Sequence, residues 1–223
     1  MLMSVDIYQI RECNQCGLRY PYVDAGNKNS RCPACLGVTQ LISEQPFIRG
    51  LTRIDCLQHP TLQKPIAGLL DNIRSALNVG AIFRTADGLG LKHLYLCGFT
   101  PTPENPEITK TGLGAQDSIP WSFHHNGVNL VKSIKMEGAG IIVVENKNEA
   151  ISIEVFKPED FRAATQVVLV VGNEITGVDP AVIDLADVCV KIPMYGKKSS
   201  FNVSNAFAIA AYVVSSKFDG IID

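Results

Sequence analysis

Four cysteines near the amino terminus have the spacing of a metal site. Cys13 and Cys16 form one Cys-x-x-Cys knuckle, and Cys32 and Cys35 form a second knuckle after 15 intervening residues. Two knuckles at this spacing are typical of a zinc ribbon, in which four thiolates surround one Zn²⁺ as a closed tetrahedron. A closed tetrahedral site is structural, so the sequence predicts a structural zinc ion here. Two unrelated cysteine pairs, or a redox-active pair, are the alternatives.

The residues around the knuckles bear on what the ribbon does. We expect Gly17 and Gly37 to supply the positive φ that each knuckle turn needs. A ribbon of about 35 residues buries too little apolar surface to fold alone, so zinc binding would be part of its folding free energy. Nearby basic side chains could contact phosphates or could simply keep the module soluble, and both readings stay open. These are Arg11, Arg19, Lys28 and Arg31.

A second group of chemically competent residues lies where two apolar runs end. Residues 167–171 (VVLVV) lead into Gly172 and Glu174, and the second run ends in residues 192–196 (IPMYG). Residues 199–204 (SSFNVS) follow and precede an Ala-rich helix. Both runs predict buried parallel strands, and open α/β sheets bind ligands at the carboxyl ends of their strands. We therefore expect a ligand site at these strand ends.

An earlier helix carries Asn78 and Arg84. Apolar residues recur at helical spacing from Val79 to Leu89 and predict its buried face, and Gly90 is placed to end it. We expect Asn78 to cap the start of the helix. Arg84 points away from the apolar face. Without further evidence, Asn78 can be explained as a helix cap and Arg84 as a surface charge.

The rest of the chain supplies the elements that position these residues. From residue 65 onward, predicted strands and helices alternate, which favours an α/β fold with a parallel sheet covered on both faces. We expect residues 1–45 to form the zinc-ribbon-like domain and residues 65–223 to form the large domain. Residues 46–64 read as a linker, with a short helix near residues 51–57.

Composition limits the class of protein. The 223 residues are 46% hydrophobic and 19% charged, which is enough for one sizeable core and a small appendage. A formal net charge of −2 attracts no polyanion over the whole surface, so nucleic-acid contacts must be local. No apolar run approaches the ~20 residues that cross a bilayer, and the first residues lack signal-peptide features. We expect a cytoplasmic protein without a membrane partner.

The motifs of several other enzyme classes are missing from the sequence. A Rossmann dinucleotide site needs Gly-x-Gly-x-x-Gly directly after the first strand, whereas Gly88 and Gly90 lie at a helix end. The sequence also lacks a Walker lysine loop, a Ser-His-Asp order and a His-Glu-x-x-His helix. A nicotinamide-dependent oxidoreductase is an alternative that rests on the α/β pattern alone.

Three motifs in a fixed order carry a family resemblance. They are Asn78 with Arg84, residues 172–174 (GNE), and residues 192–204, which contain IPMYG and SSFNVS. Together they resemble the SpoU or TrmH family of SPOUT RNA methyltransferases, over roughly residues 65–216. The resemblance implies a homodimer that transfers a methyl group from S-adenosylmethionine to a ribose 2′-hydroxyl of tRNA or rRNA. It also implies a C-terminal trefoil knot, an exception to unknotted topology.

The resemblance implies a role for each matched residue. Arg84 corresponds to the catalytic arginine of the family. Because the pKa of arginine lies above ~12, we expect Arg84 to position RNA and to stabilise developing alkoxide charge, rather than to act as a base. Its implied companions are Asn78, Glu174, Ser200 and Asn202. The residues implied around S-adenosylmethionine are Gly172, Ile192, Met194 and Phe201, with Val144 and Glu145 as a further wall.

The chain departs from the family pattern at two places. Phe201 stands where the family often has leucine, and we expect its backbone contact to remain. A four-cysteine ribbon is not the usual extension of the family, so the RNA target cannot be inherited from the resemblance. A second hypothesis is therefore a zinc-ribbon RNA-binding protein whose knotted domain is catalytically silent.

Overall fold

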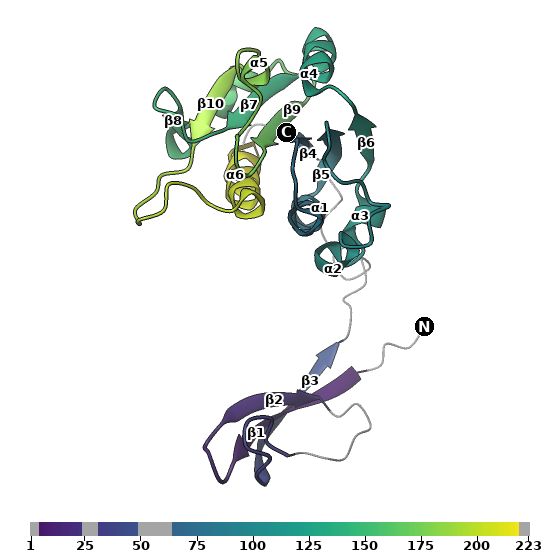
Figure 1. The fold of residues 1–223 in the computed structure, drawn as a ribbon, viewed down its shortest axis with the longest axis vertical. Helices are drawn as coiled ribbons and strands as arrows, with labels where there is room; N and C mark the ends of the chain where they lie inside the picture. The colour runs from purple at the N-terminus through teal and green to yellow at the C-terminus, as the bar shows by residue number, and fades with distance from the viewer. Residues whose placement is uncertain (1–4, 24–30, 49–63, 219–223) are drawn as a thin grey trace. The chain divides into compact units, whose positions relative to one another are not determined.

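The computed structural model describes residues 5–23, 31–48 and 64–218, and the chain divides into two compact units, Met1–Pro60 and Thr61–Asp223 (Figure 1). Each unit contains its own β-sheet. The short helix expected near residues 51–57 lies outside the described residues, as does most of the expected linker.

The small unit is a three-stranded antiparallel sheet with the strand order β2-β1-β3. The first knuckle is the turn that joins β1 to β2, and the second knuckle precedes β3. Cys13 pairs with Thr39 in the sheet register, so both knuckles lie at the same end of the sheet. The last strand continues past residue 45, where we expected the ribbon to end. The strands are β1 (Val5–Cys13), β2 (Arg19–Val23) and β3 (Thr39–Ile48).

The large unit is built on a seven-stranded sheet with the order β6-β5-β4-β9-β7-β10-β8. All of its neighbouring strands pair in parallel, which confirms the predicted parallel α/β fold. The strands are β4 (Lys64–Asp71), β5 (Leu91–Cys97), β6 (Trp121–His124), β7 (Gly140–Val144), β8 (Ile151–Ser152), β9 (Val167–Gly172) and β10 (Val188–Lys191).

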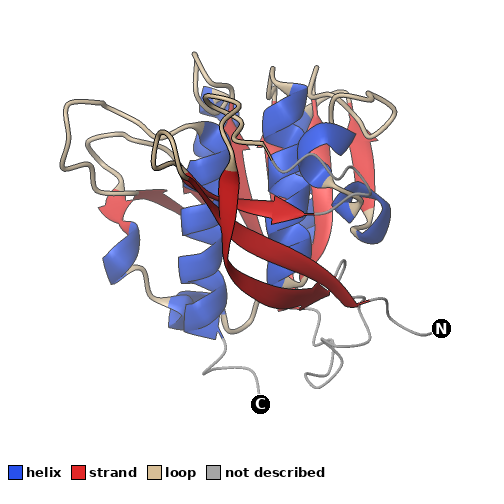
Figure 2. Cartoon of the chain, turned by 90° about the horizontal axis from the view of Figure 1, so that it is seen from below, coloured by secondary structure: helices blue, strands red, loops and turns tan. Residues whose placement is uncertain are grey.

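Helices cover both faces of this sheet, because strand residues alternate between two apolar cores. Leu169 and Val171 of β9 face α1 (Ala76–Leu89) and α6 (Val203–Phe218), while Val168 and Val170 face α4 (Gly127–Met136) and α5 (Pro180–Ile183). The long helices α1 and α6 contact each other and stand side by side in Figure 2. The shorter elements are α2 (Thr109–Gly112), α3 (Ala115–Ser118), η1 (Ile153–Val155) and η2 (Pro158–Phe161). No helix in the described part of the chain is long and apolar enough to cross a membrane.

Two strands are inserted between strands that precede them in the sequence. The strand β9 lies between β4 and β7, and β10 lies between β7 and β8. Every residue of β9 is buried, which a strand in the centre of a two-faced sheet requires. The insertion places the carboxyl end of β9 beside that of β4, which leads into α1. The trefoil knot implied by the resemblance stays a prediction.

The start of α1 differs from our expectation. Ser75, rather than Asn78, is the N-cap, and its hydroxyl accepts a hydrogen bond from the backbone N–H of Asn78 at 3.3 Å. A serine hydroxyl at this position satisfies one of the free N–H groups of the first turn. The side chain of Asn78 is therefore available for contacts outside the helix. Gly90 ends the helix with a φ of 69°, as expected.

Candidate functional site

A cavity opens where β7, β9 and β10 end. Because these strands are parallel and adjacent, the segments that follow them meet at one edge of the sheet. The cavity is lined by every residue that we expected around the cofactor: Gly172, Ile192, Met194, Phe201, Val144 and Glu145. Three of the expected catalytic residues also line it, namely Glu174, Ser200 and Asn202.

Gly172 is a glycine because the next loop folds back onto it. A Cβ atom at this position would lie 2.2 Å from the backbone nitrogen of Val178 and 2.3 Å from the carbonyl carbon of Gly177. The loop is closed by two backbone hydrogen bonds between Asn173 and Gly177, of 3.1 and 2.9 Å. Any larger residue would push this loop away from the cavity wall.

Glu145 holds the same loop from the end of β7. Its Oε2 atom accepts a hydrogen bond from the backbone N–H of Val178 at 3.0 Å. Gly177 has a φ of 74°, and a Cβ atom there would lie 2.4 Å from Oε2 of Glu145. The carboxylate therefore fixes the loop that forms one wall of the cavity.

Glu174 joins this loop to the first turn of α1. One carboxylate oxygen accepts the backbone N–H of Arg74 at 2.9 Å, and the other accepts the N–H of Ser75 at 3.2 Å and the side-chain amide of Asn78 at 2.9 Å. Partial burial raises the pKa of Glu174, but these donors lower it by more, so its pKa lies below the usual value. A carboxylate at a helix N-terminus is also stabilised by the helix dipole.

Asn202 extends this network to α6. Its side-chain amide donates a hydrogen bond to the Oδ1 atom of Asn78 at 3.2 Å. Its own Oδ1 accepts the backbone N–H of Ser204 at 2.9 Å, in the manner of an N-cap side chain. The chain of contacts from Glu174 through Asn78 to Asn202 thus links the end of β9 to the starts of two helices.

The other two expected catalytic residues are less constrained. Ser200 lines the cavity with an exposed side chain, which makes no hydrogen bond with the described residues. Arg84 is exposed on α1, six residues or about 9 Å of axial rise beyond Asn78. Its guanidinium makes no hydrogen bond or ion pair with the described residues. Within one chain, the structure does not bring Arg84 into contact with the other four.

Two residues that hold the site were missed by sequence reasoning. Asn173 donates from its side-chain amide to the carbonyl of Asn72 at 2.8 Å, and its Oδ1 accepts the N–H of Ile175 at 2.9 Å. Asp71 is 2% exposed, and its carboxylate accepts the N–H of Asp179 at 2.9 Å. Burial raises the pKa of Asp71. Asp71 ends the apolar strand β4, and Asn173 follows the apolar strand β9. A polar residue at the end of a buried strand was the sequence signal that could have identified both.

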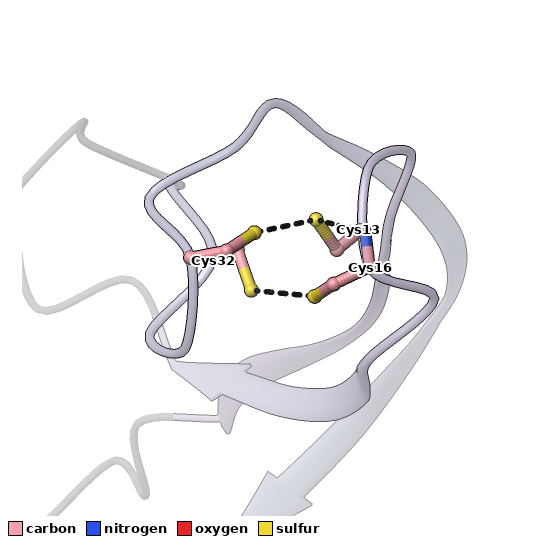
Figure 3. Close-up of side chains that lie close together, drawn as sticks. Cys13, Cys16 and Cys32 are labelled. Carbon is pink, nitrogen blue, oxygen red and sulfur yellow. Dashed lines mark hydrogen bonds between the residues drawn. The ribbon is translucent and has the colours of Figure 1, made fainter.

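The four cysteine sulfurs converge as a metal site requires. The Sγ atoms of Cys13 and Cys35 lie 3.4 Å apart, those of Cys16 and Cys32 lie 3.6 Å apart, and all four lie within 4.8 Å of one another. A Zn–S bond of 2.3 Å in a tetrahedron gives S–S edges of about 3.8 Å. Figure 3 shows the side chains turned toward a common centre. The donor set and spacing fit a structural zinc ion.

We expected a positive φ at Gly17 and Gly37, and the structure has it only at Gly17. Gly17 has a φ of 72°, but the matching position of the second knuckle is Leu36, with a φ of 60°, and Gly37 has no positive φ. Gly37 instead leaves room for neighbouring side chains. A Cβ atom there would lie 2.7 Å from the Oε1 atom of Gln15 and 3.2 Å from the sulfur of Cys13.

The basic residues of the ribbon fall into two groups. Arg11 is held by the sheet, because its guanidinium donates to the hydroxyl of Thr39 at 2.9 Å and to the Oε1 atom of Gln9 at 2.7 Å. Arg19 and Arg31 are exposed, although Arg31 donates to the carbonyl of Leu36 at 3.3 Å. Lys28 lies outside the described residues.

The fold and site define a class of α/β protein in which inserted parallel strands end at a ligand cavity. The model of the SpoU rRNA Methylase family matches residues 66–212. The chain belongs to this family, which confirms the resemblance carried by the three motifs.

Individual relatives agree with this assignment. A tRNA (guanosine(18)-2′-O)-methyltransferase of Aquifex aeolicus is 34% identical over 67% of this chain and 68% of its own length. A 23S rRNA (guanosine(2553)-2′-O)-methyltransferase of Bacillus subtilis is 32% identical over 65% of this chain and 55% of its own length. The crystal structure of the A. aeolicus TrmH/SpoU tRNA modifying enzyme is similar with a TM-score of 0.65 and 26% identity, over 75% of this chain and 83% of that one.

Proposed function

We propose that this protein transfers a methyl group from S-adenosylmethionine to a ribose 2′-hydroxyl of tRNA or rRNA. The observation that carries the proposal is the cavity at the ends of β7, β9 and β10, whose wall continues into the network of Glu174, Asn78 and Asn202. Family membership supports it, since the names of the two relatives specify methylation of a ribose 2′-oxygen. Those names specify different RNAs, so the target is not fixed by the family.

The cavity suits S-adenosylmethionine, which supplies an electrophilic methyl group. Ile192, Met194 and Phe201 offer apolar surface for a purine ring. Gly172 offers backbone polar groups without a side chain in the way. The exposed side chains of Ser200 and Asn202 lie on the same wall and can orient a second, polar reactant.

We assign different roles in the reaction to the proposed catalytic residues. A ribose hydroxyl must lose its proton as it attacks, and the two reactants must be held in line. Glu174 is ionised at neutral pH and accepts three hydrogen bonds, so we assign it to holding the first turn of α1 in place. Arg84 has no intramolecular partner among the described residues, which leaves its guanidinium available to an RNA phosphate or a developing alkoxide.

We propose that the protein is a homodimer, with the knotted topology of its family. Leu77 on α1 is 44% exposed and Tyr212 on α6 is 64% exposed, and these two helices contact each other. Large exposed side chains on adjoining helices favour burial against a second copy. Arg84 belongs to the same helix as Leu77, so such a dimer would cover it and could complete the site. Sedimentation as a monomer at micromolar concentration would contradict the dimer.

Methyl transfer from radiolabelled S-adenosylmethionine to bulk tRNA and bulk rRNA tests the proposed activity. We expect label in one of the two pools, at the ribose rather than the base. Absence of label in both pools, together with retained RNA binding, would favour a zinc-ribbon binding protein with a silent large domain. Binding of NAD without binding of S-adenosylmethionine would favour an oxidoreductase instead.

The role of the ribbon belongs to the same proposal. We propose that it holds zinc and extends the RNA contact, because Arg19 and Arg31 are exposed. Since β3 runs to Ile48, a clean truncation removes residues 1–60 rather than residues 1–45. The truncated protein should bind S-adenosylmethionine normally and bind RNA more weakly, with a smaller salt dependence. Unchanged RNA affinity would assign the ribbon to stability or to another partner. A cytoplasmic location, where tRNA and rRNA are used, is also part of the proposal.

A further inference from the structure

The segment between β10 and α6 lines the cavity at both ends and projects from the molecule between them (Figure 1). Ile192 and Met194 at one end line the cavity, as do Ser199 and Ser200 at the other. The second end is held by a hydrogen bond of 2.6 Å from the side-chain amide of Asn146 to the carbonyl of Ser199. Figure 1 shows the yellow-green chain between β10 and α6 as a projecting loop. We call residues 195–198 of this segment the tip.

The tip exposes three large side chains. The side chain of Tyr195 is 92% exposed, and those of Lys197 and Lys198 are also exposed. None of the three makes a hydrogen bond or ion pair with the described residues. A tyrosine usually buries its ring, so a ring left in solvent beside a cavity points to an external partner.

The chemistry of the tip selects the partner. Two adjacent ammonium groups attract phosphates, and an aromatic ring stacks on a base of any sequence. Cationic and aromatic groups together are the usual means of holding a single-stranded segment of nucleic acid. An apolar protein surface would match Tyr195 but would leave both lysines unpaired. The formal net charge of −2 means that attraction of RNA must come from local features such as this one.

We propose that the tip binds the nucleotides next to the one whose ribose enters the cavity, with Tyr195 stacked on a base and with Lys197 and Lys198 on phosphates. This rests on the proposed function, because it deepens how the same site selects its RNA. The three side chains are positioning residues, since they stand beside the cavity and not among its lining residues. Their substitution should therefore weaken RNA binding more than it slows methyl transfer in the bound complex.

A double substitution, K197Q/K198Q, tests the phosphate contacts in the full-length protein. The matched control is K132Q/K157Q, which removes the same charge from two exposed lysines that lie outside the cavity. For the RNA pool that accepts label, we expect KM to rise on the order of 10-fold with kcat within about 2-fold. The slope of log affinity against log salt should fall by about 1.4, or ~0.7 for each phosphate contact. S-adenosylmethionine affinity should not change.

Substitutions of Tyr195 test the stacking contact. Tyr195→Leu should raise KM on the order of 10-fold, because it keeps apolar bulk but loses the ring. Tyr195→Phe keeps the ring and should behave like the wild type. Equal loss in both variants would assign the effect to the hydroxyl and would contradict stacking.

The remaining outcomes separate failure of this inference from failure of the proposed function. If K197Q/K198Q matches the control in KM and salt slope, the tip does not contact RNA. If tip variants change sedimentation but not salt dependence, the tip is a contact between two copies of the chain and the inference is wrong. If the wild type transfers no methyl group, the activity proposal fails, and binding of bulk tRNA and rRNA to the same variants by fluorescence anisotropy still decides the role of the tip.

Discussion

Single carboxylates connect distant parts of the chain around the cavity. Glu174 accepts hydrogen bonds from the first turn of α1, and Glu145 accepts one from the loop after β9. Asp71 accepts one from Asp179, ahead of α5. Each acceptor satisfies backbone N–H groups that would otherwise be unpaired at an element end. These residues therefore hold the segments around the cavity in place.

Glu174→Gln should destabilise the protein by about 1 kcal/mol at neutral pH, a value reduced by solvent screening of this exposed side chain. Because its folded pKa lies below the unfolded value, the carboxylate contributes its full stability above about pH 5. That contribution is lost as the pH falls through the folded pKa. Urea unfolding between about pH 3 and pH 7 should show the two proteins converging at the acid end. The matched control is Glu159→Gln, at an exposed side chain without a hydrogen bond to the described residues, which should leave stability at neutral pH nearly unchanged.

Gly172→Ala should cost roughly 2 kcal/mol, because the added methyl group would overlap the backbone of Gly177 and Val178. The loop must then move, so affinity for S-adenosylmethionine should also fall. Gly88→Ala is the control, since a Cβ atom there meets nothing within 4 Å and alanine favours a helix. Thermal unfolding and calorimetric titration measure both effects. Normal cofactor affinity in Gly172→Ala would remove the loop from the binding site.

The starts of α1 and α6 form the polar side of the site. Ser75 caps α1, Asn202 supplies the cap hydrogen bonds of α6, and Asn78 joins the two through its side chain. Helix starts favour negative charge, and at the start of α1 the carboxylate of Glu174 already takes this position. The two helices therefore both cover the core and place polar groups beside the cavity.

Arg84→Ala should lower kcat by about 10²- to 10³-fold if the guanidinium stabilises developing charge. Stability and S-adenosylmethionine affinity should remain unchanged, because the exposed Arg84 makes no hydrogen bond or ion pair with the described residues and does not line the cavity. Arg84→Lys should recover little, since it loses the planar fork. Steady-state kinetics on the accepting RNA measure the effect, with Arg162→Ala as the exposed control. Turnover near the wild-type level would remove Arg84 from the catalytic residues.

The two units of the chain obtain their stability from different sources. The large unit buries two apolar cores on the faces of one sheet. Among the described residues of the small unit, the buried hydrophobic side chains are Cys13 and Cys32. A unit with so little buried apolar surface depends on a cross-link, and the proposed zinc ion on four sulfurs would supply one.

Removal of zinc should therefore unfold the small unit and leave the large unit intact. A strong chelator should release one zinc ion per chain and make residues 1–60 sensitive to protease. Cys16→Ser should have the same effect, while Cys189→Ala, outside the cluster, should not. Limited proteolysis with mass spectrometry and a metal assay provide the measurements. Protease resistance of the small unit after complete zinc loss would contradict a structural role for the metal.

The sequence by itself determined the elements and the ligand types. A continuous apolar run located the strand at residues 167–171, and apolar residues at helical spacing located the helix that holds Arg84, because local patterns of burial select local conformation. Fixed spacing of four cysteines predicted the sulfur cluster. Polar residues directly after buried strands marked the cavity.

Tertiary structure decided which of these elements meet. The insertion of β9 and β10 between earlier strands depends on hydrogen bonds between segments far apart in the chain, which no local pattern encodes. That insertion brings Glu174 to Asn78 and leaves Arg84 without a partner among the described residues. Asn78 does not cap α1, because the helix begins at Ala76 and Ser75 precedes it as the N-cap. The local sequence pattern determines whether a segment forms a strand or a helix. Pairing between distant segments determines which residues lie close together, and the site depends on residues from distant segments.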